Sequence, residues 1–278
     1  MAHPLTCPIC RGALQKEGSS YRCPKNHSYD ISRFGYTNLL SGKAVGQHGD
    51  NREMILARRR FLDSGAYAPL RDALCEAVKA HHPVGGIYLD AGCGECYYTD
   101  GVAESLAGTD SIGYGIDISK EALRAAGIRP SVKDGRVSLF VSGVYEMPFA
   151  DGSIDTVINF FAPLATEEYL RVLKDGGVLV MAIPDKRHLF ALKEILYDTP
   201  KENEVVGFAL PGFDLLSATP IRSEFTLVGE RVQDLFMMTP YYYRTPQSGK
   251  DRLAALNTLT CTGEFILLVY QKAGKEST

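Results

Sequence analysis

The stretch that most constrains this 278-residue chain is 88–98, where an apolar run ends in an acidic residue and two glycines precede a helical pattern. Residues 87–89 are β-formers, and the apolar residues of 97–107 have helical spacing. Gly92 and Gly94 lack a Cβ, so a ligand can lie directly against the backbone of the turn. The stretch predicts a strand, a tight turn and a helix start that can seat a nucleotide-like ligand.

The acidic residue narrows the class of ligand. A dinucleotide fingerprint reads G-x-G-x-x-G, whereas here Asp90 precedes Gly92 and Gly94 and the third glycine is missing. A carboxylate repels phosphate but suits a cationic amino acid group joined to adenosine, and S-adenosylmethionine has both. The stretch resembles motif I of the class I S-adenosylmethionine-dependent methyltransferases, and the plain alternative is an ordinary strand-to-helix turn.

Strands and helices alternate after this turn. Strand 112–117 ends in Asp117, 23 residues beyond Gly94, and an acid at that distance is expected to bind ribose hydroxyls. The loop 143–149 is expected to frame an adenine. A helix is predicted to start near residue 50 or 51 and to run to 62. Further elements are predicted as helices 67–80, 121–126, 166–173 and 230–238, strands 136–141, 156–161, 178–183, 221–228 and 265–270, and a covering loop at 210–219. This order predicts an α/β class I methyltransferase fold, with a Rossmann-like, mostly parallel sheet and an antiparallel C-terminal strand.

The N-terminal segment has the spacing C-x2-C-x12-C-x3-H. Such spacing predicts a zinc site in which Cys7 and Cys10 form one knuckle and Cys23 and His27 close a tetrahedron. Four protein ligands fill the coordination shell, so the zinc is expected to be structural. Three free thiols with a surface histidine are the alternative.

Basic residues are concentrated in the N-terminal part of the chain. Residues 1–60 carry ten Lys or Arg against four Asp or Glu, although the net charge of the whole chain is −3. We expect a basic zinc-binding module for RNA recognition at 1–40, a linker at 41–53 and a methyltransferase domain at 54–278. The sequence has neither a membrane-length apolar run nor a secretory signal, which predicts a cytoplasmic protein with no membrane partner.

Together with the zinc motif, these signals resemble one family over almost the whole chain: the bacterial 23S ribosomal RNA (guanine-N(1))-methyltransferases that act on a hairpin of domain II, including tylosin-resistance relatives. The resembling stretches include 7–10, 21–27, 35–40, 57–59, 61–70, 92–95, 187–189 and 238–240. The resemblance implies a homodimer, a zinc bound by the three cysteines and His27, and a cofactor pocket that adds Tyr67, Gly94, Glu95 and His188. The chain departs from the pattern at Cys96, where many members have a third glycine, and at 159–163, where the pattern often opens with a basic residue.

The target base needs its own contacts. Phe160, Phe161 and Pro163 follow a strand at the edge of the sheet where ligands bind, so they are candidates to stack on a guanine, with core packing as the alternative. Asp185 is a weak candidate for the group that accepts the guanine N1 proton. The cluster 241–244, three tyrosines and an arginine, suits either packing or unstacked bases.

Two other functions are compatible with this sequence. A class I methyltransferase of small molecules would share the catalytic domain, and a non-enzymatic zinc-dependent RNA-binding protein would share the N-terminal module. Asp90, Gly92, Gly94 and Asp117 argue against the second of these, because a protein that binds no cofactor has no need of them.

Overall fold

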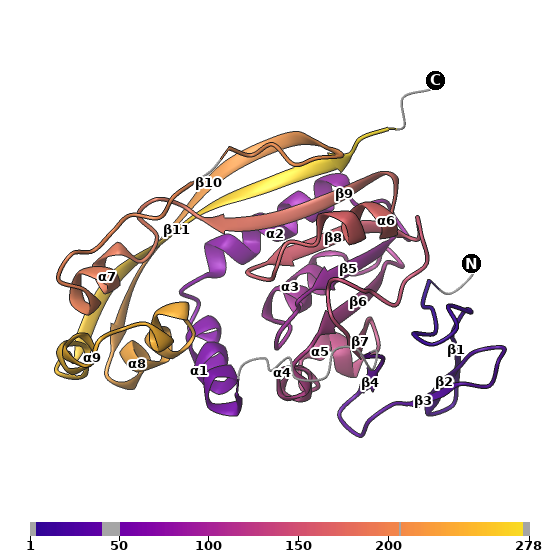
Figure 1. Cartoon of the computed structure of the whole chain (residues 1–278), viewed down its shortest axis with the longest axis horizontal. Coiled ribbons are helices and arrows are strands. Elements are labelled where there is room, and N and C mark those ends of the chain that lie inside the picture. The colour runs from indigo at the N-terminus through magenta and orange to yellow at the C-terminus, as the bar shows by residue number, and fades with distance from the viewer. Residues whose placement is uncertain (1–3, 41–50, 206, 275–278) are drawn as a thin grey trace.

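The main body of the protein is an eight-stranded sheet with the order β10-β11-β9-β8-β5-β6-β7-β4 (Figure 1). The computed structural model describes residues 4–40, 51–205 and 207–274. Strands β9 to β4 of this order pair in parallel, whereas β11 pairs antiparallel with β9 and β10 with β11. The strands are β4 Tyr36–Asn38, β5 Ile87–Ala91, β6 Ile112–Asp117, β7 Val137–Val141, β8 Ile154–Phe160, β9 Leu173–Pro184, β10 Phe213–Val228 and β11 Thr258–Lys272. The predicted fold class is confirmed.

Helices cover the sheet on both faces because alternate residues of each buried strand point to opposite sides. On one face, Tyr88, Leu139 and Ile158 share a core with residues of α1, α2, α3 and α4, and on the other, Leu89 and Val157 pack with residues of α6. The helices are α1 Arg52–Asp63, α2 Ala68–His81, α3 Tyr97–Ser105, α4 Lys120–Ala126, α5 Pro130–Lys133, α6 Thr166–Val172, α7 Phe190–Leu196, α8 Glu230–Met237 and α9 Gln247–Ala254, with a 3-10 turn η2 at Pro240–Tyr243.

The strand order reverses beside β5. The chain moves from β5 through β6 to β7 on one side, and then returns to β8 and β9 on the other. In open sheets of this kind the crevice beyond the carboxyl ends of the strands at the reversal point is the usual ligand site. The glycine turn follows β5, so it lies at that crevice.

The N-terminal segment packs on the sheet. It contains a small antiparallel sheet of β1 Gln15–Glu17, β2 Ser20–Arg22 and β3 Ser28–Asp30, and then β4 pairs in parallel with β7 at the edge of the large sheet. The sheet therefore continues across the first predicted domain boundary, because β4 lies within 1–40. The predicted linker 41–53 falls on residues 41–50, which are outside the described part of the chain, and on 51–53, which begin α1 with Asn51 as its N-cap.

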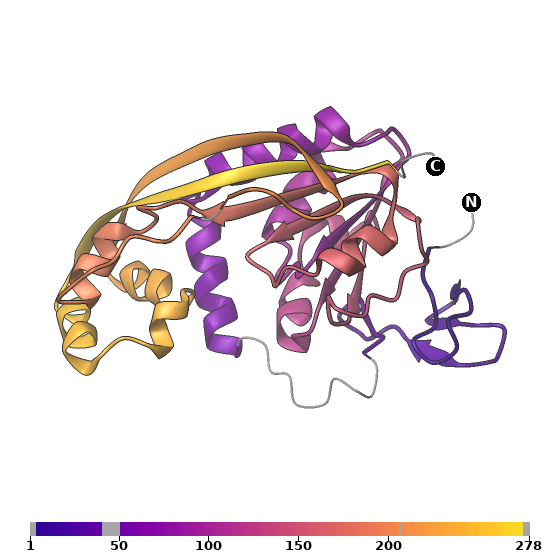
Figure 2. The ribbon, with the colours of Figure 1, turned by 45° about the horizontal axis from the view of Figure 1, so that its top comes forward.

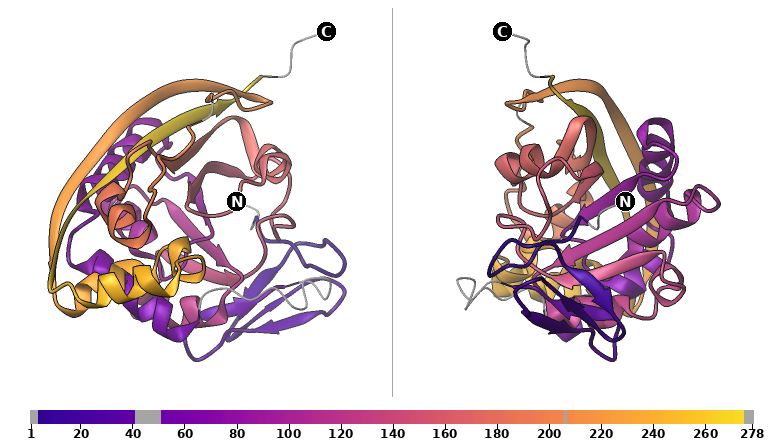
Figure 3. Two further views of the ribbon diagram at one scale, coloured as in Figure 1. Left: turned by 60° about the vertical axis from the view of Figure 1, so that its left-hand side comes forward. Right: turned by 90° about the vertical axis from the view of Figure 1, so that its right-hand side faces the viewer.

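Strands β10 and β11 are longer than the sequence predicts. They form an arch along the outside of the molecule. Helices α7, α8 and α9 gather at one end of the arch, and the N-terminal module lies on the opposite side of the molecule from these helices (Figures 2 and 3). The covering loop expected at 210–219 is wrong, since β10 begins at Phe213. Residues 174–177, between the predicted helix 166–173 and the predicted strand 178–183, lie inside β9. In the described residues, no helix combines the length and apolarity that crossing a bilayer requires.

Candidate active site and metal centre

A cavity of about 450 Å³ opens at the carboxyl ends of β5, β6 and β8, which is within the size range of small-molecule sites. Every residue predicted to bind the cofactor or to stack on the base lines this cavity: Tyr67, Asp90, Gly92, Gly94, Glu95, Phe160, Phe161, Pro163, Asp117 and His188. Asp185 does not line it. The roles of the individual residues stay predictions, and their positions limit what each can do.

The glycine turn has the geometry that only glycine permits. Gly92 has φ +92°, and a Cβ there would collide with the Cβ of Ala162, so a side chain is excluded by both conformation and space. Gly94 has φ +55°, and a Cβ there would meet no atom within 4 Å. The backbone at Gly94 therefore faces open space, as a bound ligand requires.

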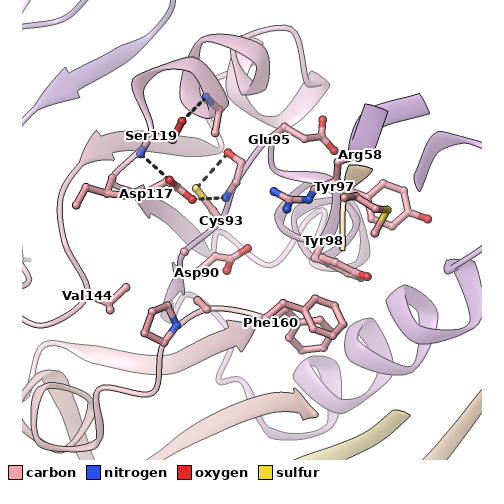
Figure 4. A pocket seen from close by; sticks show the side chains of 18 of the residues that line it. Arg58, Asp90, Cys93, Glu95, Tyr97, Tyr98, Asp117, Ser119, Val144 and Phe160 are labelled. Atoms are coloured by element: carbon pink, nitrogen blue, oxygen red, sulfur yellow. Dashed lines mark hydrogen bonds between the residues drawn. The ribbon is translucent and has the colours of Figure 1, made fainter. Parts of the chain in front are cut away.

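Asp117 is held in a fixed orientation at the end of β6. Its Oδ2 accepts the backbone N–H of Gly94 at 2.9 Å, and its Oδ1 accepts the backbone N–H of Ser119 at 2.7 Å (Figure 4). Ser119 in turn caps α4 by accepting the N–H of Ala122. A carboxylate can accept up to four hydrogen bonds, so these two backbone bonds fix the orientation of Asp117 without using all of its acceptor positions.

Asp90 is buried at the end of β5, with 2% of its surface exposed. Burial raises the pKa of Asp90 to about 7, and the nearby charge of Asp117 adds to this rise. A hydrogen bond of 2.5 Å from Thr99 Oγ1 to Asp90 Oδ2 acts in the opposite direction. A half-ionised buried carboxyl is well suited to a cationic ligand, because a bound ammonium group restores the charge that burial suppresses.

Glu95 is held by two arginines. Its carboxylate accepts hydrogen bonds from Arg129 Nη2 at 2.6 Å and Arg59 Nε at 2.8 Å, and only 1% of the side chain is exposed. Burial raises the pKa of Glu95, and the two guanidinium groups oppose that rise. The Glu95 carboxylate thus joins α1 and the segment before α5 to the glycine turn, which leaves mainly its backbone to face the cavity.

His188 is neutral, because burial lowers its pKa to about 4. The backbone N–H of Glu264 donates to His188 Nδ1 at 3.2 Å, so in the neutral ring the proton lies on Nε2. The ring packs on Phe265 with centroids 4.5 Å apart. His188 can therefore donate one hydrogen bond to a ligand, but it is a poor proton acceptor.

The structure separates the three residues proposed to stack on a base. Phe160 is 5% exposed and packs against Tyr98, with ring centroids 4.8 Å apart, so it belongs to the wall of the cavity. Phe161 is 51% exposed and has φ +61°, a conformation that costs energy for any residue other than glycine. Pro163 is also exposed. Of these three residues, Phe161 is thus the best placed to stack on a base.

Asp185 has no geometric support as a proton acceptor. Its Oδ1 accepts the backbone N–H of Lys186 at 2.7 Å, and its backbone N–H donates to Glu264. Sequence reasoning had also missed two residues that line the cavity, Arg58 and Tyr98. The Tyr98 hydroxyl is buried and has no partner among the described residues, which indicates that a ligand or water satisfies it.

The predicted zinc ligands come together. One ligand atom from each of Cys7, Cys10, Cys23 and His27 lies within 4.8 Å of the others. The Sγ atoms of Cys10 and Cys23 are 3.6 Å apart, and His27 Nδ1 is 3.4 Å from the Sγ atoms of Cys7 and Cys23. These separations are close to those of atoms bound about 2.0–2.3 Å from one tetrahedral ion. Tyr29 adds a hydrogen bond of 3.0 Å to Cys7 Sγ, which orients that ligand.

The aromatic cluster 241–244 is mostly packed. Tyr241 contacts Tyr197, with ring centroids 6.3 Å apart, and Tyr242 contacts Phe236 at 5.5 Å. Tyr243 is 70% exposed, and its hydroxyl contacts the sulfur of Met54 at 3.0 Å. Packing therefore accounts for the first two rings of the cluster.

Comparisons with known proteins agree with both sites. Residues 5–43 match the zinc-ribbon model described as "RlmA, N-terminal", and residues 83–235 match the model of a methyltransferase domain. In a complex of the Haloferax volcanii Trm112 methyltransferase activator with a methyltransferase, one chain is 17% identical over 81% of this chain and 99% of its own length, with a TM-score of 0.50. That likeness concerns the fold alone.

Several relatives match this chain nearly end to end, and two of them are described here. A protein of Bacillus subtilis (strain 168), named "Putative 23S rRNA (guanine-N(1)-)-methyltransferase YxjB", is 32% identical over 96% of each chain. The 23S rRNA (guanine(748)-N(1))-methyltransferase of Streptomyces fradiae is 30% identical over 91% of this chain and 90% of its own. S-adenosylmethionine and a structural zinc are accordingly the cofactors of this chain. The chain belongs to the 23S rRNA (guanine-N(1))-methyltransferase family.

Proposed function

We propose that the protein transfers the methyl group of S-adenosylmethionine to N1 of a guanine in a hairpin of 23S ribosomal RNA. The observation that carries the proposal is the near end-to-end match to relatives named for this reaction, zinc module included. A methyltransferase of small molecules has no need of such a module. The proposed substrate implies a cytoplasmic protein. The family resemblance implies a homodimer, and light scattering of the purified protein tests that oligomeric state.

The geometry suits the chemistry of this transfer. The sulfonium supplies an already activated methyl group, so the protein mainly has to position N1 in line with it and exclude water. Guanine N1 faces its partner in a duplex, so the base has to leave the stack before it reacts. Phe161 offers a half-exposed ring at the cavity for the extruded base. Neutral His188 can donate from Nε2 to an acceptor atom of either the base or the cofactor.

The proposal is tested with purified protein, labelled S-adenosylmethionine and 23S ribosomal RNA from cells that lack the enzyme. Digestion and mass spectrometry are expected to yield 1-methylguanosine, and reverse transcription is expected to stop at one guanine, because a methyl group on N1 blocks pairing. Methylation at another guanine atom contradicts the N1 assignment. Label that enters small molecules but no RNA contradicts the RNA substrate.

The Phe161 ring gives a sharper test of the base site. Phe161→Ala is expected to lower kcat/KM for the RNA by about tenfold to a hundredfold, since base–aromatic stacking contributes about 1–3 kcal/mol. The dissociation constant of S-adenosylmethionine should change little. Tyr243→Ala, which removes another exposed ring away from the cavity lining, is the matched control. Equal losses in both variants would argue against a specific stack on Phe161.

A further inference from the structure

Tyr145 is an exposed aromatic side chain at the rim of the cavity. It belongs to the loop after β7 that was expected to frame an adenine, but 65% of its surface is exposed. Its neighbour Val144 is 8% exposed and belongs to an apolar core, whereas Tyr145 belongs to neither core of the described residues. A tyrosine that packs into no core and lines the opening of a cavity has its ring available for a ligand.

The residues that follow Tyr145 connect the zinc module to the cavity. Glu146 pairs with Arg11 of the module, with 2.9 Å between Oε1 and Nη2. The backbone N–H of Thr6 donates to the carbonyl oxygen of Pro148 at 2.8 Å. Tyr145 therefore lies between the zinc module and the interior of the cavity. The ion pair also offsets a negative charge that would repel the phosphates of an RNA there.

Tyr145 is on the side of the opening where the candidates for base contacts lie. Burial raises the pKa of Tyr169, and Tyr145 is near enough to add to that rise. The Tyr169 hydroxyl donates to the carbonyl oxygen of Pro163 at 3.1 Å. Tyr145 thus lies towards the segment in which Phe161 and Leu164 are 51% and 43% exposed. Large apolar side chains exposed together beside a cavity are typical of an interaction site.

Tyr145 and Phe161 reach the cavity from different strands. Tyr145 follows β7 and Phe161 follows β8, and β5 and β6 separate these two strands in the sheet. At the usual spacing of about 4.8 Å between neighbouring strands, the two strand ends lie about 14 Å apart. Bases stacked in one strand are only about 3.4 Å apart. The two rings are therefore placed for two nucleotides rather than for the two faces of one base.

We infer that Tyr145 stacks on the base of a nucleotide adjacent to the target guanine. The inference rests on the proposed RNA substrate and adds a second aromatic contact to it. When the guanine leaves the strand, its neighbour loses a stacking partner, and the flat Tyr145 ring replaces that partner. RNA held at the zinc module crosses Tyr145 on its way to the cavity, so the stack also fixes which nucleotide of the strand reaches the cofactor.

The test is a double-mutant cycle between Tyr145 and the nucleotides beside the methylated one. Once that nucleotide is mapped, RNAs are made that carry an abasic nucleotide on its 5′ or its 3′ side. With the wild-type chain, one of the two abasic RNAs is expected to lower kcat/KM about tenfold, mainly through a higher KM. Tyr145→Ala should cause a similar loss with the intact RNA. The same abasic change should then cost Tyr145→Ala nothing further, because the partner ring is already missing.

Two further variants make the result specific. Tyr145→Phe keeps the flat ring and should keep the wild-type response to the abasic RNAs. Tyr243→Ala removes an exposed tyrosine that does not line the cavity, and it should change neither kcat/KM nor that response. Isothermal titration without RNA should give the same dissociation constant for S-adenosylmethionine in every variant, which also shows that each variant is folded.

An unchanged kcat/KM of Tyr145→Ala with the intact RNA would overturn the inference. So would abasic changes that cost the wild-type chain and Tyr145→Ala the same factor, because the ring and the neighbouring base would then act independently. Weaker binding of S-adenosylmethionine to Tyr145→Ala with an unchanged KM for RNA would assign the ring to the cofactor instead. Failure of the proposed function is seen separately, since the wild-type chain would then methylate no RNA or another atom of the base.

Discussion

The raised pKa of Asp90 predicts a pH dependence for cofactor binding, if Asp90 contacts the cofactor as the sequence predicts. Its pKa of about 7 means that the free protein carries Asp90 partly protonated near neutrality. Binding of an ammonium group requires the ionised form, whereas the α-amino group of the ligand itself loses its proton with a pKa of about 8. Affinity for the cofactor is therefore controlled by two titrations with opposite effects.

We expect the affinity for S-adenosylmethionine to fall by up to tenfold per unit as pH drops below about 7, and to fall again above about 8. Isothermal titration between pH 5.5 and 9 measures both limbs. Asp90→Asn should bind more weakly and should lose the acidic limb while it keeps the alkaline one. An acidic limb that survives in Asp90→Asn would assign it to another group.

The same carboxyl affects the stability of the ligand-free protein with the opposite sign. The folded pKa is raised above the unfolded value of about 3.9, so the folded state binds more protons between about pH 4 and 7. The contribution of Asp90 to stability is therefore fully present below about pH 4 and is lost as pH rises towards 7. Denaturant unfolding of wild type and Asp90→Asn should show this difference in slope across that window, and a saturating cofactor should reduce it.

Cys96 adopts a left-handed backbone conformation at the position where many members of the family have a glycine. It is fully buried at φ +64°, a left-handed conformation that costs about 1–2 kcal/mol for a residue with a Cβ. Cys96→Gly removes that cost but also a small buried side chain, so we expect the free energy of unfolding to change by less than about 1 kcal/mol. Cys75→Gly, in the helical interior of α2, should lose roughly 2 kcal/mol instead. Equal losses in the two variants would contradict this account.

At this scale, the sequence was informative where function depends on local backbone geometry. Gly92, Gly94 and Asp117 are connected to one another within one turn and the next strand, so their spacing is enough to predict them. Glu95 and Arg58 depend on segments far away in the chain. One partner of Glu95 is Arg129, 34 residues later, and no local pattern indicates that pairing.

Helix α1 is positioned by ion pairs as well as by apolar packing. Arg59 reaches Glu95 in the glycine turn, and Arg60 reaches Asp234, which is 4% exposed on α8. Arg129 also contacts Asp63 at the end of α1, with 3.0 Å between Nη1 and Oδ1. Because α1 also carries Arg58 and Leu62 to the cavity, these ion pairs determine the shape of the cofactor site.

Removing the Glu95 charge should therefore affect stability and cofactor binding together. Glu95→Gln leaves Arg59 and Arg129 without a buried partner charge, and breaking such a pair costs about 3–5 kcal/mol. We expect a lower free energy of unfolding in denaturant and weaker S-adenosylmethionine binding. Glu121→Gln, which breaks an exposed pair with Arg124 on α4, should cost less than about 1 kcal/mol. A Glu95→Gln variant as stable as Glu121→Gln would show that the pairs do not fasten α1.

Elements buried on both sides were predictable, and elements at the edges were not. The strand 112–117 matches β6 residue for residue because its β-formers Ile112, Tyr114 and Ile116 alternate along it. β10 is mostly exposed along its length as the outer strand of the arch, so it has no apolar alternation to recognise. β4 has three residues, which are too few to show an alternation of apolar and polar side chains. Its partner β7 begins about 100 residues later.

On the scale of the whole molecule, the zinc module packs against β7, and the segment that follows β7 lines the cavity. Leu5, Leu14 and Tyr21 belong to the same apolar core as Phe140 of β7, and the Tyr21 and Phe140 rings are 5.4 Å apart. Residues 4–6 exchange backbone hydrogen bonds with 148–150. The segment 142–145, directly after β7, lines the cofactor cavity. The sequence predicts that the zinc module recognises RNA, and the packing also connects the module to the cavity.

Zinc removal should therefore change hydrogen exchange and cofactor affinity outside the zinc module as well as within it. A structural zinc in so small a unit contributes on the order of 10 kcal/mol to its folding, so chelation should unfold β1 to β3 and release β4 from the sheet edge. Hydrogen exchange is expected to rise in 5–31, in β7 and in 142–149, while β9 in the middle of the sheet stays protected. Because 142–145 lines the cavity, S-adenosylmethionine should also bind several-fold more weakly, and adding zinc back should restore it. Exchange that rises in 5–31 alone, with unchanged cofactor affinity, would mean that the sheet holds its edge without the metal.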